Sequence, residues 1–260
     1  MEQREHLGLE ALQHLQGEYE DCDKCPLLCK SRSGPVFGTG SATAPIMIIG
    51  DAPGEDEDAC GVPFAGPAGR RLMDLLRMAW PPTEETAALD ALWDQWGDTD
   101  KYWDALRDYF DEHVFWTNLV LCRPTDSDGD PRSPAPIEIK NCRDRLLRTI
   151  YAVDPLLIIA VGKAPASALV GKVIQIVKQR GEVFDVKIPS PVTGDPVRYP
   201  CQAILSPGFL MQRGDAGLLD LGQGGTYETL EDLKWAITTM LAPQYRDAYG
   251  TEFPERPDRN

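Results

Sequence analysis

The chain has 260 residues, of which 42% are apolar, and a formal net charge of −15. This length and apolar content suit one large domain, and the acidic balance argues against binding nucleic acid through a general basic surface. No apolar run approaches the roughly 18 residues that span a bilayer, and the N-terminus lacks the basic start and apolar stretch of a signal peptide, so we expect a soluble, cytoplasmic protein.

The negative charge is concentrated in two segments. Residues 1–23 carry a net charge of −6 and residues 81–112 a net charge of −8, so the rest of the chain is nearly neutral. Residues 120–190 hold eleven basic and eight acidic side chains. A phosphate-binding surface in this later region is therefore compatible with the overall charge.

Helical periodicity and apolar runs alternate along the chain. Helices are predicted over residues 5–20, 67–79, 136–153 and 228–241, with another opening at Gly162 and Lys163. Core strands are predicted over residues 44–50, 114–118, 156–161 and 200–205, and an edge strand over 183–188. Continuously apolar strands separated by helices indicate an α/β fold with a mostly parallel sheet. Ligands then bind beyond the carboxyl ends of the strands, at loops 51–66, 118–132 and 206–213.

These elements suggest one domain over residues 1–242. Its first helix places five apolar side chains at roughly helical spacing, namely Leu7, Leu9, Leu12, Leu15 and Tyr19. The acidic segment 81–112 is predicted to be a helical insertion, broken into two helices near Gly97. Residues 243–260 are rich in proline and are expected to form an extended tail.

Seven cysteines in a chain without an export signal are better interpreted as metal ligands or buried thiols than as disulfides. Cys22 and Cys25 form a C-x2-C pair, and Cys122 and Cys142 are a second, widely spaced pair. This spacing favours an iron–sulfur cluster on the four over a zinc ribbon, which would repeat the short spacing. Cys29 allows a rival ligand set with Cys22 and Cys25. The remaining two, Cys60 and Cys201, are expected to be plain small apolar residues.

A series of motifs carries a resemblance to a known family. In chain order they are CDKCPL, VFGTG, IIGDAPGEDEDACGVPFAGPAGRRL, TNLVLCRP, EIKNCRDRL, DPLLIIAVGKAPASAL, KQRGEV and ILSPGFL. Together they resemble the iron–sulfur uracil-DNA glycosylases of families 4 and 5, over roughly residues 22–80, 114–182 and 200–213. The resemblance implies a three-layer αβα sandwich with a mostly parallel four-stranded central sheet. It also implies a structural 4Fe–4S cluster on Cys22, Cys25, Cys122 and Cys142.

The same resemblance assigns roles around a flipped nucleotide. Asp51, where the family usually has Glu, would position water or stabilise positive charge on the sugar, and Glu57 is a rival carboxylate for that role. Phe64 would stack on the base and Asn118 would read its edge. Ala52 and Gly208 complete the expected base-binding set.

The third site loop departs from the family pattern. Many members place a histidine there that donates to the base carbonyl, whereas this chain has Ser206, a weaker neutral donor, followed by Pro207 and Gly208. One interpretation is a DNA glycosylase for uracil or for a bulkier modified pyrimidine, as in some phage DNA, with a role in antiphage defence or phage DNA metabolism. The alternative is a catalytically inactive DNA-binding or protein-interaction module.

We expect a monomer that binds DNA in single- or double-stranded form. Arg123 and Arg132 are candidates for phosphate contacts, although solvated surface positions explain them equally well. The acidic insertion is a candidate docking surface for a protein partner, or a mimic of DNA charge.

Overall fold

The computed structural model describes residues 2–212 and 225–241. Five strands are present in this part: β1 (Ile46–Gly50), β2 (Val114–Asn118), β3 (Leu157–Val161), β4 (Val183–Pro189) and β5 (Pro196–Ile204). The helices are α1 (Glu2–Tyr19), α2 (Pro26–Ser31), α3 (Glu55–Cys60), α4 (Pro67–Ala79), α5 (Glu84–Trp96), α6 (Asp100–His113), α7 (Pro136–Val153), α8 (Lys163–Val170), α9 (Ile176–Gln179), α10 (Pro207–Gln212) and α11 (Gly225–Met240). None of the helices in the described ranges is long and apolar enough to cross a membrane.

The strands form one sheet in the order β2-β1-β3-β5-β4. The first four are parallel, as the alternation of strands and helices predicted. The implied count of four strands needs correction, because β4 adds a fifth strand that pairs antiparallel with β5. β4 matches the edge strand predicted over residues 183–188 and alternates buried and more exposed residues, as an edge strand with one solvated face does. The count of four came from the family resemblance.

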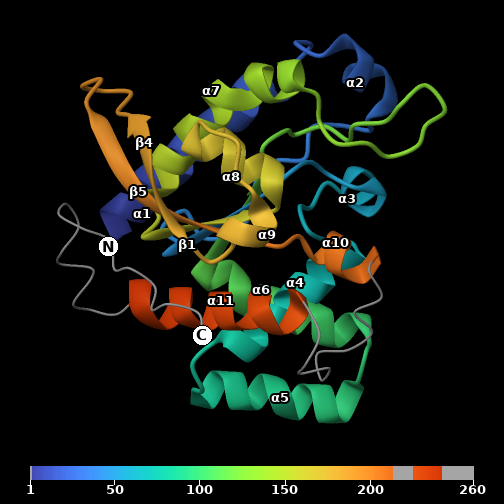
Figure 1. Ribbon diagram of the computed structural model, residues 1–260, viewed down its shortest axis with the longest axis vertical. Helices are drawn as coiled ribbons and strands as arrows, with labels where there is room; N and C mark the ends of the chain where they lie inside the picture. The colour runs from blue at the N-terminus through green and yellow to red at the C-terminus, as the bar shows by residue number, and fades with distance from the viewer. Residues whose placement is uncertain (1, 213–224, 242–260) are drawn as a thin grey trace.

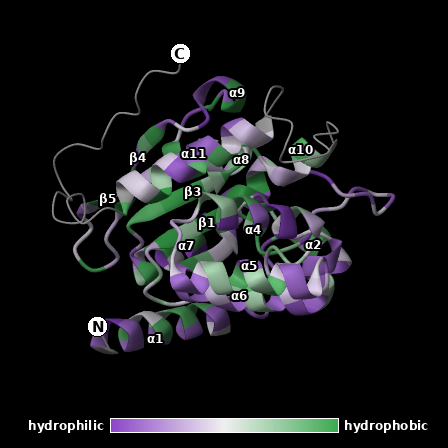
Figure 2. Cartoon of the chain, turned by 90° about the horizontal axis from the view of Figure 1, so that it is seen from below, coloured by the Kyte–Doolittle hydropathy of each residue, from purple (hydrophilic) through white to green (hydrophobic). Residues whose placement is uncertain are grey.

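Helices cover both faces of the sheet, which confirms the three-layer αβα arrangement. Figure 1 shows α1, α7 and α8 on one side and α4, α6 and α11 on the other, with α5 outermost. Side chains of β1 divide between the two cores: Met47 and Ile49 join the core under α7, and Ile46 and Ile48 join the core under α4 and α11. This period-two division fills both interfaces with apolar side chains, visible as the green strands between helices in Figure 2.

Two sequence-based expectations for the helices were incomplete. In α1, Leu15 and Tyr19 are buried as expected, but Leu7 and Leu9 are 57% and 47% exposed. Gly8, between them, is the buried residue of this turn, and a Cβ there would lie 3.1 Å from the Ala42 carbonyl and 3.2 Å from the Ala152 carbonyl, so the two leucines flank the packed face of the helix. The helices α2, α3, α9 and α10 were not predicted, because segments of four to six residues are too short for periodicity to show.

The acidic insertion consists of two helices, as predicted. Thr83 caps the start of α5 by accepting a hydrogen bond from the backbone of Thr86. Gly97 ends α5 with a positive φ of 59°, a conformation that favours glycine. α6 then packs against the sheet through Trp103, Leu106 and Phe110. The predicted tail, residues 243–260, lies outside the described part of the chain.

A buried ion pair attaches α11 to the sheet. Arg180, which follows α9, lies 2.7 Å from Asp232 of α11, and both side chains are almost completely buried. Glu228, one turn earlier on α11, lies 2.5 Å from the same guanidinium but is half exposed. Both of these carboxylates belong to α11, so the two ion pairs join that helix to Arg180.

We expect Asp232→Ala to lower the free energy of unfolding by about 3 kcal/mol, because it removes the buried carboxylate that pairs with Arg180. Urea denaturation followed by circular dichroism measures this. The matched control is Asp185→Ala, which breaks a partly exposed pair with Arg198 and should cost about 0–1 kcal/mol. Equal costs for the two variants would contradict the assignment.

Candidate active site

The candidate site forms where β1 and β2 end side by side. Gly50 is the register partner of Asn118, and the backbone N–H of Leu119 donates to the Gly50 carbonyl at 2.9 Å. A Cβ on Gly50 would clash with the Asn118 amide oxygen and lie 2.8 Å from Cζ of Phe64. Only glycine therefore lets Asn118 and Phe64 come together across the strand end.

Asp51, directly after β1, presents a carboxylate that has no partner among the described residues. Its Oδ1 is buried and accepts no hydrogen bond within the described ranges. A Cβ on Gly162, at the end of β3, would lie 3.7 Å from this oxygen and 3.5 Å from Cβ of Ser206. Burial raises the pKa of Asp51 to about 6, so the carboxylate is ionised near neutral pH but poorly solvated.

Phe64 is held in a strained backbone conformation. Its φ is 59°, in the left-handed region that a bulky side chain rarely adopts. α4 packs against it so closely that a Cβ on Gly69 would collide with the Phe64 carbonyl. The ring lies 5.6 Å from the ring of Trp116 on β2, centroid to centroid. Such strain persists only where the surroundings enforce it, and it concentrates at functional sites.

Arg107 of α6 contacts both the loop that carries Phe64 and the ring of Trp116. Its guanidinium donates to the carbonyl of Pro63 at 2.9 Å and lies 4.8 Å from the centroid of the Trp116 ring. The first contact holds the residue before Phe64, and the second covers the ring against which Phe64 packs. The insertion thus contributes to the geometry of the candidate site, which the sequence did not reveal.

Asn118 has a buried side chain, 4% exposed, at the floor of the site. No hydrogen bond from its amide to the described residues is found, although its backbone carbonyl accepts one from Arg145 at 2.7 Å. The backbone is therefore fixed while both amide groups remain available. This is the arrangement that bidentate recognition of a base edge requires.

Glu57, the rival carboxylate, is occupied by its own loop. Its two oxygens accept hydrogen bonds from the backbone N–H groups of Gly54, at 2.9 Å, and Gly66, at 2.8 Å. The side chain thereby closes the loop that carries Phe64. Between the two acids, this geometry favours Asp51 for contact with a ligand.

The third loop continues into α10. The hydroxyl of Ser206 accepts a hydrogen bond from the backbone N–H of Phe209 at 3.4 Å. A Cβ on Gly208 would lie 3.6 Å from that hydroxyl oxygen, so Gly208 leaves open space beside it. Ala52 is partly buried against the core under α7. Asp51, Phe64, Asn118 and Ser206 thus meet at one edge of the sheet.

Comparison with known proteins identifies the family of this chain. Residues 37–204 match the family described as the uracil DNA glycosylase superfamily. The chain belongs to this superfamily. Relatives include type-4 uracil-DNA glycosylases of Archaeoglobus fulgidus, 30% identical over 69% of this chain and 75% of the relative, and of Pyrobaculum aerophilum, 34% identical over 66% and 71%. The type-4 enzyme of Saccharolobus solfataricus is 34% identical over 67% and 66%.

The four cysteines assigned to the cluster lie in one region of this glycosylase fold. Cys122 and Cys142 are buried in the core under α7, and Cys22 and Cys25 pack against the same core. Within the described ranges, no three His, Cys, Asp or Glu side chains surround a point closely enough for a single metal ion.

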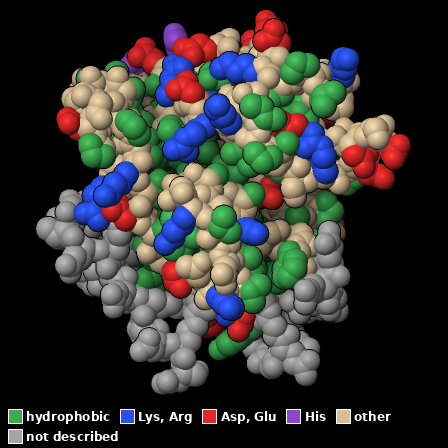
Figure 3. All heavy atoms as spheres, turned by 45° about the horizontal axis from the view of Figure 1, so that its top comes forward, with side chains coloured by type: hydrophobic (Ala, Val, Ile, Leu, Met, Phe, Trp, Pro, Cys, Tyr) green, Lys and Arg blue, Asp and Glu red, His purple; other side chains and the backbone are tan. Residues whose placement is uncertain are grey.

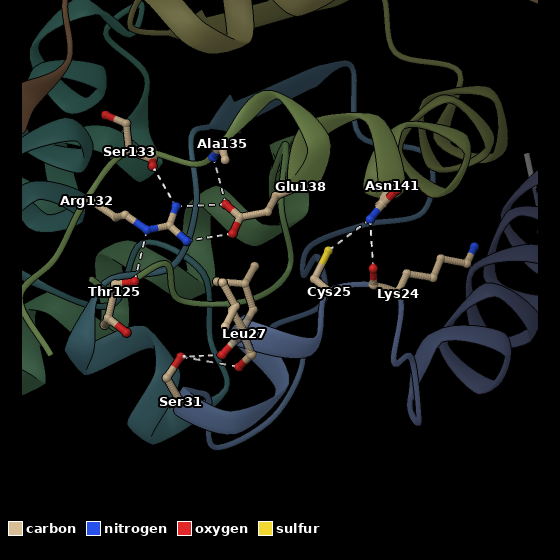
Figure 4. A network of polar contacts seen from close by, with 11 residues as sticks. Lys24, Cys25, Leu27, Ser31, Thr125, Arg132, Ser133, Ala135, Glu138 and Asn141 are labelled. Atoms are coloured by element: carbon tan, nitrogen blue, oxygen red, sulfur yellow. Dashed lines mark hydrogen bonds and ion pairs between the residues drawn. The ribbon is translucent and has the colours of Figure 1, made fainter. Parts of the chain in front are cut away.

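Hydrogen-bond donors directed at the sulfurs support the same assignment. Arg32 donates to Sγ of Cys122 at 2.7 Å and to the carbonyl of Cys22 at 2.7 Å. Asn141 donates to Sγ of Cys25 at 3.4 Å (Figure 4). Donors of this kind orient thiolate ligands and compensate their charge. The side chains present therefore fit the implied group.

The other three cysteines differ in their surroundings. Cys29, in the rival ligand set, donates its thiol to the carbonyl of Cys22 at 3.4 Å. Cys201 is completely buried on β5, as expected for a small apolar residue, and burial raises the pKa of its thiol to about 12. Cys60 was expected to be similar but is exposed at the end of α3, because the helix turns that position outward.

The two arginines considered for phosphate contacts are both engaged. Arg132 forms a bidentate pair with Glu138 at the start of α7, at 2.6 and 2.9 Å (Figure 4). Arg123 lies 3.2 Å from Glu55 of α3, which is mostly exposed, and its Nε has no hydrogen-bond partner in the described chain. Arg123 is therefore the better candidate of the two. Basic side chains also spread across the face in Figure 3, while acidic ones gather towards its upper and right margins.

The buried carboxylate of Asp51 makes stability depend on pH. In the unfolded chain it ionises near 3.8 and in the folded protein near 6, so the folded state loses stability as pH rises through this interval. We expect Asp51→Asn to raise the free energy of unfolding by about 2–3 kcal/mol at about pH 8, and to change it little at about pH 4.

Denaturant titrations at the two pH values measure this difference. The control is Asp104→Asn, at an exposed position of α6, which should change stability little at either pH. An Asp51→Asn variant no more stable than the parent at the higher pH would contradict the burial argument.

Proposed function

We propose that this protein is a DNA glycosylase that hydrolyses the N-glycosidic bond of a flipped uracil or modified pyrimidine and leaves an abasic site. The observation that carries the proposal is the unpartnered, buried carboxylate of Asp51 beside the free amide of Asn118 and the ring of Phe64. Family membership supports the reaction class.

Binding of the base uses two of these groups. A nucleotide flipped out of the DNA stacks on Phe64, whose position Trp116 and Arg107 enforce. The amide of Asn118 hydrogen-bonds the exposed edge of the base, with Ala52 and Gly208 shaping the adjacent pocket. Flipping exposes the bond to be cleaved, which is inaccessible within a duplex.

Cleavage depends on Asp51. As the base departs as an anion, positive charge develops on the deoxyribose, and an ionised carboxylate stabilises it or positions the attacking water. Poor solvation of Asp51 strengthens this interaction relative to that of a surface carboxylate. Glu57 acts indirectly, by holding the loop that carries Phe64.

Ser206 determines how strongly the departing base is stabilised. A neutral hydroxyl is a weaker donor than the histidine of many relatives, and together with Gly208 it leaves more space. This favours a pyrimidine with a larger substituent, such as a hypermodified base of phage DNA, and hence a role in antiphage defence or phage DNA metabolism. DNA is the expected partner, bound by a monomer, and the acidic insertion remains a candidate contact for another protein.

Cys22, Cys25, Cys122 and Cys142 would hold a 4Fe–4S cluster. When bound, the cluster supplies a covalent cross-link between the N-terminal segment and the segment that follows β2. Cys122 follows Asn118 closely in the chain, so this cross-link stabilises the strand end that presents the base-reading amide. The catalytic groups themselves belong to Asp51, Asn118 and Phe64.

We expect anaerobically purified protein to be brown and to contain about four irons and four sulfides per chain. Iron and sulfide analysis with an absorption spectrum measures this. Cys142→Ser should lose the cluster, whereas Cys60→Ser, at an exposed cysteine outside the group, should retain it. A colourless protein with about one zinc ion would overturn the assignment.

We expect cleavage of oligonucleotides that contain uracil or a 5-substituted pyrimidine, detected as strand breaks at abasic sites after alkali. Asp51→Asn should lower the rate by about two orders of magnitude or more, because it removes the charge opposed to the cationic sugar. Activity of the parent should fall as pH drops through about 6, where Asp51 becomes protonated. The control is Asp74→Asn, whose carboxyl is partly buried and also has a raised pKa but lies outside the site, on α4.

Ser206→His separates the two interpretations of the third loop. If a weak donor limits uracil excision, the variant should accelerate it. If the pocket serves a bulkier base, the variant should slow cleavage of that base instead. A protein that cuts no substrate in the panel, with Asp51→Asn leaving DNA binding unchanged, would identify the inactive binding module.

A further inference from the structure

Arg145 is a buried cation on the inner face of α7. The residue is 2% exposed, and its terminal nitrogens donate to three neutral oxygens. These are the Thr117 hydroxyl at 3.1 Å, the Asn118 carbonyl at 2.7 Å and the Leu119 carbonyl at 3.1 Å. One guanidinium thus donates hydrogen bonds to three consecutive residues at the end of β2.

This charge has no carboxylate partner among the described residues. No ion pair to Arg145 is found there, and its Nε, which is also buried, has no hydrogen-bond partner. A guanidinium stays charged in proteins, so a buried one needs a negative group nearby.

Two of the cluster cysteines supply the place for that negative group. Cys142 lies three residues before Arg145, on the same face of α7, because residues i and i+3 are neighbours on a helix. Cys122 comes three residues after Leu119, whose carbonyl Arg145 holds. Cysteine ligates metal as thiolate, and four thiolates on a 4Fe–4S core leave the assembly with a net negative charge.

We propose that Arg145 is the buried counter-ion of the iron–sulfur cluster and that the same guanidinium positions Asn118, so that cluster and base-reading amide share one cation. The proposal rests on the cluster assignment made above. Arg32 reaches Cys122 from the N-terminal segment, whereas Arg145 approaches from the core. Of the two cations, only Arg145 also contacts the strand end of the active site. Arg145 is a positioning residue, since it acts on the base through Asn118.

The test compares Arg145→Met, which removes the charge but keeps an unbranched side chain, with Arg145→Lys, which keeps the charge but loses the fork. Arg143→Met is the matched control, since Arg143 is exposed on the same helix, next to Cys142. Iron and sulfide content of the parent protein is measured first. A parent without iron and sulfide would defeat the cluster assignment itself, a failure distinct from that of Arg145.

The decisive readout is the reduction potential of the cluster, from a redox titration followed by electron paramagnetic resonance. Arg145→Met should shift the potential downwards, because removal of a nearby positive charge disfavours the added electron. Arg145→Lys and Arg143→Met should stay close to the parent. A potential unchanged in Arg145→Met, or an equal shift in Arg143→Met, would overturn the proposal.

If Arg145→Met does not hold iron, its potential cannot be measured, and the iron content of the variants is the readout instead. Loss of iron from Arg145→Met but not from Arg145→Lys supports the counter-ion role, since the two differ in charge. Loss from both, with Arg143→Met intact, shows that the fork rather than the charge matters and overturns it. Arg145→Lys retains the cluster at the parent potential only if the charge suffices. In that case its KM for the DNA substrate should rise more than its kcat falls, because the Asn118 carbonyl loses the hydrogen bond from the guanidinium.

Discussion

The pairing of β1 with β2 is the interaction on which the site depends. Parallel strands end at the same edge of the sheet, and this register places Gly50 opposite Asn118. The missing side chain at Gly50 admits the Phe64 ring and the Asn118 amide to one space, while Asp51 begins the next loop. A one-residue slip would turn Asn118 to the other face, so apolar packing of both strands fixes the chemistry as well as the fold.

The parts of the fold that the sequence predicted are those with a repeating pattern. β2, α4 and α7 have the predicted bounds, because continuous apolar runs and helical stripes leave little alternative. Contacts between distant segments have no such pattern, and the engagement of Glu57 with Gly54 and Gly66 could not be predicted. Arg145 did leave a signal that was missed, since a basic residue in register with Cys142 lies within the buried stripe of α7.

The acidic insertion reconciles the net charge with a role on DNA. Its outer helix, α5, lies on the far side of the sheet from α7, so much of the negative charge stands away from the face with scattered basic side chains (Figures 1 and 3). Its inner helix directs one cation inward, Arg107, to the carbonyl before Phe64. The insertion therefore helps to hold the Phe64 ring in place, and deleting it would remove this contact from the candidate site.

Asp51 and Arg145 are both buried ionisable side chains, one acidic and one basic. Each is an ionisable group buried without a compensating partner among the described residues, at a cost to folding. In the proposed function, Asp51 faces the positive charge that develops on the sugar, and Arg145 adjoins the thiols that would hold the negatively charged cluster. Asn118 lies between them, its backbone held by the cation and its amide beside the anion's loop. The two uncompensated charges thus lie where the proposed ligands, the cationic sugar and the anionic cluster, would supply the opposite charge.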